Sequence, residues 1–365
     1  MADRPSPALR VSVVMPAFNA EAYLAEAIES VLRQTMGDLE IVVVDDGSID
    51  NSRAIVERFR EADPRVRLVV HERNLGISAA LNRGWQAARS PLIARLDADD
   101  AALPDRLERQ SAFLDAHPSV AVVGGAAHVV DGAGKRISTM RFPTESAVIH
   151  ATLRRHNCLA HPTVMLRRSV LEDVGGYRFD HSEDYNLWLR LAERFDLANL
   201  AEPLILYRVH GSQLSLLDLE DRVKGALAVR AAAKIRRANG TDPLAGEAEL
   251  TEELFERLGV KDQDLSRALE HELVSWANML GDLGQPAEAL KLVDQAARRF
   301  GPRARRAFAA ARELQAAEAL LGSGRPLAGS WRVLLAFRRE PRYASDRLRA
   351  WLADHLGGRS VFRGR

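Results

Sequence analysis

The 365-residue chain contains a single cysteine, Cys158. One cysteine excludes an intramolecular disulfide, and no Cys/His spacing in the chain resembles a zinc site, which is typical of a reducing compartment. No segment approaches the roughly 18 unbroken apolar residues of a membrane span, and residues 1–10 have no apolar core of a signal peptide. These absences predict a cytoplasmic protein that neither spans a membrane nor is secreted by a signal peptide.

A large excess of charge is also missing, because the formal net charge is +1 at pH 7. Such a balance does not by itself indicate nucleic acid as a partner. Residues 303–365 are different: 14 arginines and no lysine stand against five acids, for a net charge near +9. Apolar residues are interspersed there, namely Trp331, Val333, Leu334, Leu335, Phe337, Leu348, Trp351, Leu352 and Leu356. This region predicts either peripheral contact with an anionic membrane or an ordinary helix core with solvated arginines.

The first half of the chain alternates β-rich runs with amphipathic helical stretches. Strands are predicted at residues 11–15, 41–44, 67–70 and 92–96, with helices at residues 20–34, 52–62 and 77–88 between them. Asn19 is the expected N-cap of the first helix. The pattern predicts an α/β fold with a largely parallel sheet flanked by helices.

The alternation weakens after Pro104. A helix to His117, a strand at residues 120–123 broken by Gly124 and Gly125, a strand at 163–167, a helix at 182–195 and a closing strand at 204–209 predict a mixed sheet. From Leu216 onward, Ala, Leu, Arg and Glu dominate and β-branched runs disappear. We therefore predict an α/β domain over residues 9–215 and an all-helical region over residues 216–365.

Two carboxylates, Asp97 and Asp99, follow an apolar strand at alternate positions, and Asp100 continues the cluster. Open α/β sheets bind ligands at the carboxyl ends of their strands, and hard oxygens there suit Mg²⁺ or Mn²⁺ bridging phosphates. Solvated turn residues before a helix are the alternative interpretation.

A second acidic strand end comes from Asp45 and Asp46, which precede Gly47. In a parallel sheet this end lies on the same edge as Asp97 and Asp99. A carboxylate there could accept hydrogen bonds from a base or a ribose, and Gly47 would let backbone approach a ligand. A simple Asp-Gly turn is equally compatible with these residues.

Other candidates surround the same edge. Pro16, Phe18 and Asn19 end the first strand and could form a wall for a planar base. Asn74 and Arg83 supply hydrogen-bond donors, and the positive charge of Arg83 would offset the charge of a diphosphate. Alternatively, Pro16, Phe18 and Asn19 are only the connection between a strand and a helix, and Arg83 is a solvated surface residue.

Asp184 shares a helix face with Leu187 and Trp188, so its carboxylate is predicted to point inward. The helix N-terminus should favour its ionised form, which would keep a proton acceptor available. His210 could supply an imidazole to a metal held by Asp99. Structural capping for Asp184 and a structural role for His210 remain open from these residues alone.

Several short motifs appear in order: Pro16-Ala17-Phe18-Asn19, Asp45-Asp46-Gly47-Ser48, Arg73-Asn74-Leu75-Gly76, Asp97-Ala98-Asp99-Asp100, Gly175-Gly176-Tyr177, Glu183-Asp184 and Tyr207-Arg208-Val209-His210-Gly211. Together they resemble the family 2 glycosyltransferases over residues 11–215. Two departures are Ile49, where a threonine is common, and a short stretch from Gly176 to Glu183.

The resemblance implies a GT-A fold, a nucleoside-diphosphate sugar donor, a divalent cation (Mg²⁺ or Mn²⁺) and transfer with inversion to a glycan or lipid-linked acceptor. It implies that Asp46 reads the base beside Pro16 and Phe18, and that Asp97 and Asp99 hold the ribose and the metal-diphosphate. It further implies Asp184 as the catalytic base and His210 as a metal ligand. Additional candidates for the site are Glu21, Asp45, Asp100 and Glu183.

Two rival functions stay open at this point. A sugar nucleotidyltransferase would want a glycine-rich phosphate loop near the first strand, and residues 11–20 contain no glycine. A non-catalytic scaffold acting through the helical region would not need the candidate acidic groups, all of which are present. Both features favour the glycosyltransferase interpretation.

Overall fold

The computed structural model describes residues 9–180, 182–210, 219–247 and 249–282, and beyond them residues 293–294, 298, 306, 309–310, 312–314, 326–341 and 344–345. The chain divides into two compact units, Met1–Gly259 and Val260–Arg365. The first unit holds a sheet with its helices, and the second is helical where it is described. The boundary expected after Ser215 falls inside the first unit, and its functional meaning remains a prediction.

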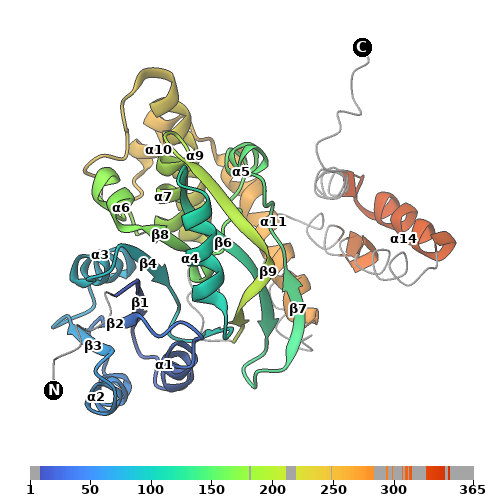
Figure 1. Ribbon diagram of the computed structural model, residues 1–365. Coiled ribbons are helices and arrows are strands. Elements are labelled where there is room, and N and C mark those ends of the chain that lie inside the picture. Colours follow the sequence, from blue (N-terminus) through green and yellow to red (C-terminus); the bar gives the residue numbers. More distant parts are fainter. Residues whose placement is uncertain are drawn as a thin grey trace, which may run out of the picture. The chain divides into compact units, whose positions relative to one another are not determined.

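One mixed sheet runs through the first unit (Figure 1). Its strands among the described residues are β1 (Val11–Ala17), β2 (Leu39–Asp45), β3 (Val66–Val70), β4 (Leu92–Arg95), β5 (Ala101–Ala102), β6 (Val120–Val130), β7 (Arg136–Met140), β8 (Met165–Arg167) and β9 (Asp196–Arg208). Their order is β3-β2-β1-β4-β8-β6-β9-β5, and β7 pairs with β6. The first four strands in this order are parallel, whereas β8 runs antiparallel to β4 and β6. The predicted mixed α/β sheet is confirmed.

Helices cover both faces of the parallel strands. The helices of the first unit are α1 (Leu24–Leu32), α2 (Ser52–Ala62), α3 (Ile77–Ala87), α4 (Arg106–Ala116), α5 (Ser146–Leu153), α6 (Arg168–Val174), α7 (Glu183–Leu191), α9 (Leu219–Asn239) and α10 (Glu252–Leu258), with a 3-10 turn, η1 (His161–Thr163). Successive strand residues point to opposite faces. Val13 and Val43 thus pack with α1, α2 and α4, whereas Val42 and Val44 pack with Ala80 of α3.

The predicted break at Gly124 and Gly125 is wrong, because β6 runs through both glycines. A Cβ on Gly124 would lie 2.4 Å from Oδ1 of Asn199, and one on Gly125 would lie 2.5 Å from Cδ1 of Leu204. The two glycines therefore allow close approach of the neighbouring β9 rather than a turn.

Two other local predictions are corrected. The first helix begins at Leu24 with Tyr23 at the N-cap position, so Asn19 does not cap it. Asn19 instead adopts a positive φ of 50° and accepts a hydrogen bond from the backbone N–H of Ile49. The closing strand, β9, already begins at Asp196, because a register shift opposite Ala126 lets Pro203 lie within it.

The remaining described helices are α11 (Asp262–Asp282) and α14 (Pro326–Arg339), both in the second unit. Across the described residues, every helix is too short or too polar to cross a bilayer.

The described part of the basic region is only partly packed. In α14, Ala336 is buried with Ala310 and Ala344, and Phe337 packs against them. Leu334 is 60% exposed. Leu348, Trp351, Leu352 and Leu356, together with the side chain of Trp331, lie outside the described residues. Peripheral membrane contact therefore remains a prediction.

Candidate active site

Three parallel strands bring the predicted donor-site residues to one edge of the sheet. β1 ends just before Phe18, β2 ends at Asp45 and β4 ends just before Leu96. Pro16 is the exception, since it lies inside β1, buried and paired with Val44. Phe18 is 44% exposed, so its ring is available at this edge.

Asp97, Asp99 and Asp100 form a compact acidic cluster after β4. Each offers a carboxylate oxygen, and these three oxygens lie within 4.8 Å of one another. Oδ1 of Asp100 accepts a hydrogen bond from the backbone N–H of Arg208, but its Oδ2 is buried and has no hydrogen-bond partner in the part of the chain that the structure describes. Burial and the two neighbouring carboxylates raise the pKa of Asp100 well above its ordinary value. A buried oxygen without a donor, set among carboxylates, fits a divalent cation that prefers oxygen ligands.

Arg95, the last residue of β4, is buried directly beside this cluster. Its guanidinium forms a two-point ion pair with the carboxylate of Asp97. Burial raises the pKa of Asp97 to about 6, an effect that Arg95 opposes and that Asp99 and Glu183 increase. The charge of Glu183, at the start of α7, thus acts on the acidic cluster.

His210 lies where the resemblance to the family implied a metal ligand. Its Nε2 is 3.0 Å from Oδ2 of Asp99, and its ring lies 5.1 Å from the ring of Tyr23. An imidazole nitrogen and the carboxylate oxygens of the cluster could bind one cation together.

Asp46 is buried behind the neighbouring loop. Its carboxylate accepts hydrogen bonds of 3.0 Å from the backbone N–H groups of both Leu75 and Gly76, and Oδ1 lies 2.6 Å from Nδ1 of His71. The carboxylate thus orders the loop after β3 at the edge where a nucleotide is expected. Asp45 has a local partner, because its Oδ1 accepts from the backbone N–H of Ser48.

Asp184 lies at the start of α7 and is partly buried. Nδ2 of Asn157 donates a 2.7 Å hydrogen bond to its Oδ2. Burial and the neighbouring Glu183 raise the pKa of Asp184, although the bond from Asn157 lowers it. The expectation that the helix N-terminus would favour the ionised form is therefore corrected, because desolvation is the stronger effect. A raised pKa makes the ionised carboxylate a stronger base.

Glu183, beside Asp184, is the last member of a series of polar side-chain contacts. Nδ1 of His161 lies 3.3 Å from its carboxylate, and Nε2 of His161 lies 3.1 Å from the hydroxyl of Tyr177. Burial and Arg95 lower the pKa of His161 well below its ordinary value. The neutral ring can accept from Tyr177 and donate to Glu183, which fixes the start of α7.

Residues 12–175 match the family model described as "Glycosyl transferase family 2". The amylovoran biosynthesis glycosyltransferase AmsE of Erwinia amylovora is 35% identical over 54% of this chain and 75% of its own length. The chain belongs to glycosyltransferase family 2. The O-antigen biosynthesis glycosyltransferase WbnJ of Escherichia coli is 33% identical over 55% of this chain and 80% of its own length.

The GT-A-like fold of this family 2 chain also has a solved counterpart. Residues 1–349 of S. aureus TarS, in complex with UDP-GlcNAc, superpose with a TM-score of 0.51 and 20% identity, covering 90% of this chain and 91% of that one. The match to the family model ends at Gly175, so Asp184 and His210 lie beyond the matched residues and their roles remain predictions.

The remaining predicted residues, Glu21, Asn74 and Arg83, differ in their contacts. Glu21 accepts hydrogen bonds from the backbone N–H and the side chain of Asn51. Asn74 accepts from the backbone N–H of Gly76, inside its own loop. Arg83 is exposed on α3 and has no ion pair among the described residues.

The segment before α7 is anchored on α3 in this glycosyltransferase. Oδ1 of Asp180 accepts a 2.8 Å hydrogen bond from the backbone N–H of Ser78, in the first turn of α3. The side chain of Asn82 donates to the carbonyl of Tyr177 and accepts from its N–H, both at 2.9 Å. The short stretch noted in the sequence therefore connects the donor edge to the start of α7.

Sequence reasoning missed Arg95, Asn157 and Arg208 as members of this site. Arg208 stood inside a quoted motif, and it is 3% exposed at its side chain. A buried arginine needs hydrogen-bond acceptors around it. The position of Arg208, at the end of a predicted strand and two residues before His210, was the signal that could have identified it as a site residue.

Proposed function

We propose that this chain is an inverting, cation-dependent glycosyltransferase that uses a nucleoside-diphosphate sugar. The observation that carries the proposal is the cluster of Asp97, Asp99 and Asp100, which holds a buried oxygen without a partner among the described residues. The charge of Glu183, which precedes Asp184 in α7, acts on this cluster. The TarS structure holds a donor of this class, UDP-GlcNAc.

In the proposed reaction, Asp184 takes the proton of the acceptor hydroxyl. The hydroxyl oxygen then bonds to the anomeric carbon while the bond from that carbon to the diphosphate breaks, which inverts the configuration and releases a nucleoside diphosphate. A divalent cation held by Asp99, Asp100 and His210 would neutralise charge on the departing diphosphate. Asn157 orients the Asp184 carboxylate, and Asp46 holds the loop of the nucleotide side.

The acceptor is proposed from the relatives. AmsE is named for amylovoran biosynthesis and WbnJ for O-antigen biosynthesis. We propose a hydroxyl of a growing glycan or lipid-linked saccharide as acceptor, on the cytoplasmic side of the membrane. The transferase domain is proposed to span residues 9–215.

Replacing Asp184 tests the base. We expect Asp184→Asn to lower transfer by a factor of roughly 10² to 10⁴ and to leave the dissociation constant of the donor, measured by calorimetry, unchanged. Asp173→Asn is a matched control, because the Asp173 side chain is 54% exposed and its one ion pair among the described residues is with the exposed Arg194. Wild-type turnover in the Asp184 variant would exclude this residue as the base.

Removal of the metal tests whether transfer depends on a divalent cation. Transfer should be lost after dialysis against a chelator and should return with Mg²⁺ or Mn²⁺. Asp99→Asn should weaken Mn²⁺ binding, measured by electron paramagnetic resonance with a nucleoside diphosphate present, whereas Asp173→Asn should not. Full turnover of metal-free enzyme would contradict cation dependence.

A further inference from the structure

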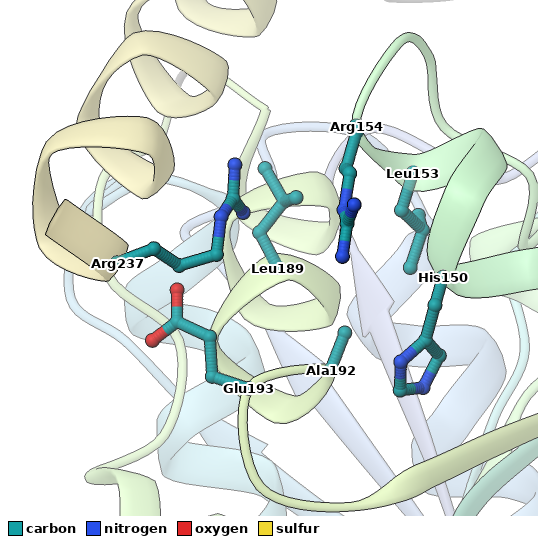
Figure 2. A pocket seen from close by; sticks show the side chains of 7 residues that line it. All are labelled: His150, Leu153, Arg154, Leu189, Ala192, Glu193 and Arg237. Atoms are coloured by element: carbon teal, nitrogen blue, oxygen red, sulfur yellow. The ribbon is translucent and has the colours of Figure 1, made fainter. Parts of the chain in front are cut away.

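A cavity lies at the other end of α7 from Asp184 (Figure 2). It is lined by His150 and Leu153 of α5, by Arg154, by Leu189, Ala192 and Glu193 at the end of α7, and by Arg237 of α9. All of these residues belong to the first compact unit. None of them takes part in the proposed transfer reaction.

Two guanidinium groups face this cavity without a counter-ion. Figure 2 shows Arg154 and Arg237 reaching toward Leu189 from opposite walls. Neither has a hydrogen bond or an ion pair among the described residues. The nearby carboxylate of Glu193 is already occupied, because it accepts hydrogen bonds of 2.9–3.0 Å from Arg236. Both side chains are exposed, so solvent screens their mutual repulsion, and an anion bound between them would be attracted by both charges.

His150 also lines the cavity. Its Nε2 is buried away from solvent and has no hydrogen-bond partner among the described residues, so this nitrogen does not open into the cavity. The donors that the cavity offers to a ligand are therefore the guanidinium groups of Arg154 and Arg237.

The helix dipole also favours arginine in the last turn of a helix. That effect explains a basic residue near the end of α5 or α9, but it does not explain why both side chains point into one cavity. By contrast, Arg190 of α7 does bind carbonyl groups at the end of a helix, through Val174 and Gly176. Arg154 and Arg237 make no such bonds within the described part of the chain.

We infer that this cavity binds a phosphoryl group through Arg154 and Arg237. Guanidinium groups bind phosphate oxygens with charge-assisted, often paired hydrogen bonds. Leu153, Leu189 and Ala192 line the cavity beside these donors, so an apolar portion could adjoin the phosphoryl group. The ligand class is thus a phosphate ester or a free phosphate.

The position of the cavity connects it to the base. Arg154 and Asn157 are three positions apart in the same loop, and Asn157 holds the carboxylate of Asp184. If the ligand is a lipid phosphate, this part of the inference rests on the proposed function, because the phosphate would belong to the acceptor. A free phosphate would instead act on the loop that carries Asn157.

Binding of inorganic phosphate to the metal-free protein tests the inference. Calorimetry in a buffer without other oxyanions should show binding to the wild-type chain. The double variant Arg154→Gln, Arg237→Gln should bind phosphate at least tenfold more weakly, since each lost charged hydrogen bond is worth about a tenfold change or more. Arg58→Gln is the control, because Arg58 is an exposed arginine of α2 without an ion pair among the described residues. Absence of binding, or equal binding by the double variant, would overturn the inference.

A second arm distinguishes the two sources of the phosphoryl group. A short-chain prenyl phosphate should bind more tightly than inorganic phosphate if the apolar residues contact a lipid, and equally if the ligand is free phosphate. Either result supports a phosphoryl site in this cavity, provided that the double variant binds the phosphate compound more weakly than the wild-type chain does. Both arms measure binding without donor or turnover, so their failure is separate from failure of the proposed transferase activity.

Discussion

The backbone carbonyl of Asp99 accepts a 2.9 Å hydrogen bond from Nε of Arg208. The same guanidinium lies 4.6 Å above the ring of Tyr23, and that ring contacts His210. Because His210 bonds in turn to the carboxylate of Asp99, the four residues form a closed ring of contacts. The arrangement holds the two proposed metal ligands against each other through residues that are not ligands themselves.

Arg208 is therefore expected to control cation affinity as a positioning residue. A lysine keeps the charge but cannot donate at once to Asp99, to Glu26 and to the carbonyl of Gly132, as Arg208 does. We expect Arg208→Lys to weaken Mn²⁺ binding by roughly 10- to 100-fold, as seen when partners of metal ligands are removed.

Electron paramagnetic resonance of Mn²⁺, with a nucleoside diphosphate present, measures this effect independently of turnover. Arg33→Lys, directly after α1, is the control, since the ion pair of Arg33 with Glu29 is exposed and contributes little. A circular dichroism melt of each variant reports whether it is folded. Wild-type Mn²⁺ affinity in a folded Arg208→Lys chain would show that the ring of contacts does not position the ligands.

The hydrogen bond from Asn157 predicts a change in the pH dependence of transfer. Asp184 must be ionised to accept a proton, so the rate rises as pH rises through its pKa. The bond from Asn157 lowers that pKa, and Asn157→Asp replaces the donor with a negative charge while an oxygen remains for the N–H of Leu159. The acid limb of kcat/KM should move to higher pH, with about a tenfold loss on that limb and little loss on the plateau.

The control for the added charge is Asn239→Asp, at the end of α9 and exposed. Its pH profile should match that of the wild-type enzyme. An unchanged acid limb in Asn157→Asp would separate Asn157 from the base, and a uniform loss at every pH would indicate a structural role only.

Gly125→Ala should destabilise the sheet. The new Cβ would lie 2.5 Å from Cδ1 and 2.8 Å from Cγ of Leu204, which is fully buried. Overpacking of this kind costs roughly 1–3 kcal/mol. Denaturant unfolding measures the loss against Gly37→Ala, where a Cβ meets nothing within 4 Å. Equal unfolding free energies would mean that β9 can shift away from β6 at little cost.

The basic region predicts salt-dependent binding to anionic lipid. With a net charge near +9 over residues 303–365 and about 1 kcal/mol per basic residue near an anionic surface, the full chain should float with anionic phospholipid vesicles at low ionic strength. Neutral vesicles serve as the control, and high salt should release the protein. A chain that stays at the bottom of the gradient with anionic vesicles at low salt would contradict peripheral attachment.

The local pattern of apolar and polar residues predicted most of the α/β domain, because hydrophobic periodicity reports directly which residues are buried. The helix expected at residues 52–62 is α2 with the same bounds, and the strands on either side are shifted by at most two residues. The errors occur where a distant segment decides the local conformation. Gly124 and Gly125 look like a break in the sequence, but they continue a strand because β9 packs closely on them.

The sequence by itself determined the sheet class, the acidic end of β4 and the family of this protein, since each depends on short-range patterns and their order along the chain. Only the tertiary structure decided which groups share an environment. It buried Arg95 beside Asp97, joined Asn157 to Asp184, and raised the pKa of Asp184 against the expectation from its helix. The physical reason is that desolvation and charge interactions depend on distances through space, which residue spacing along a chain does not contain.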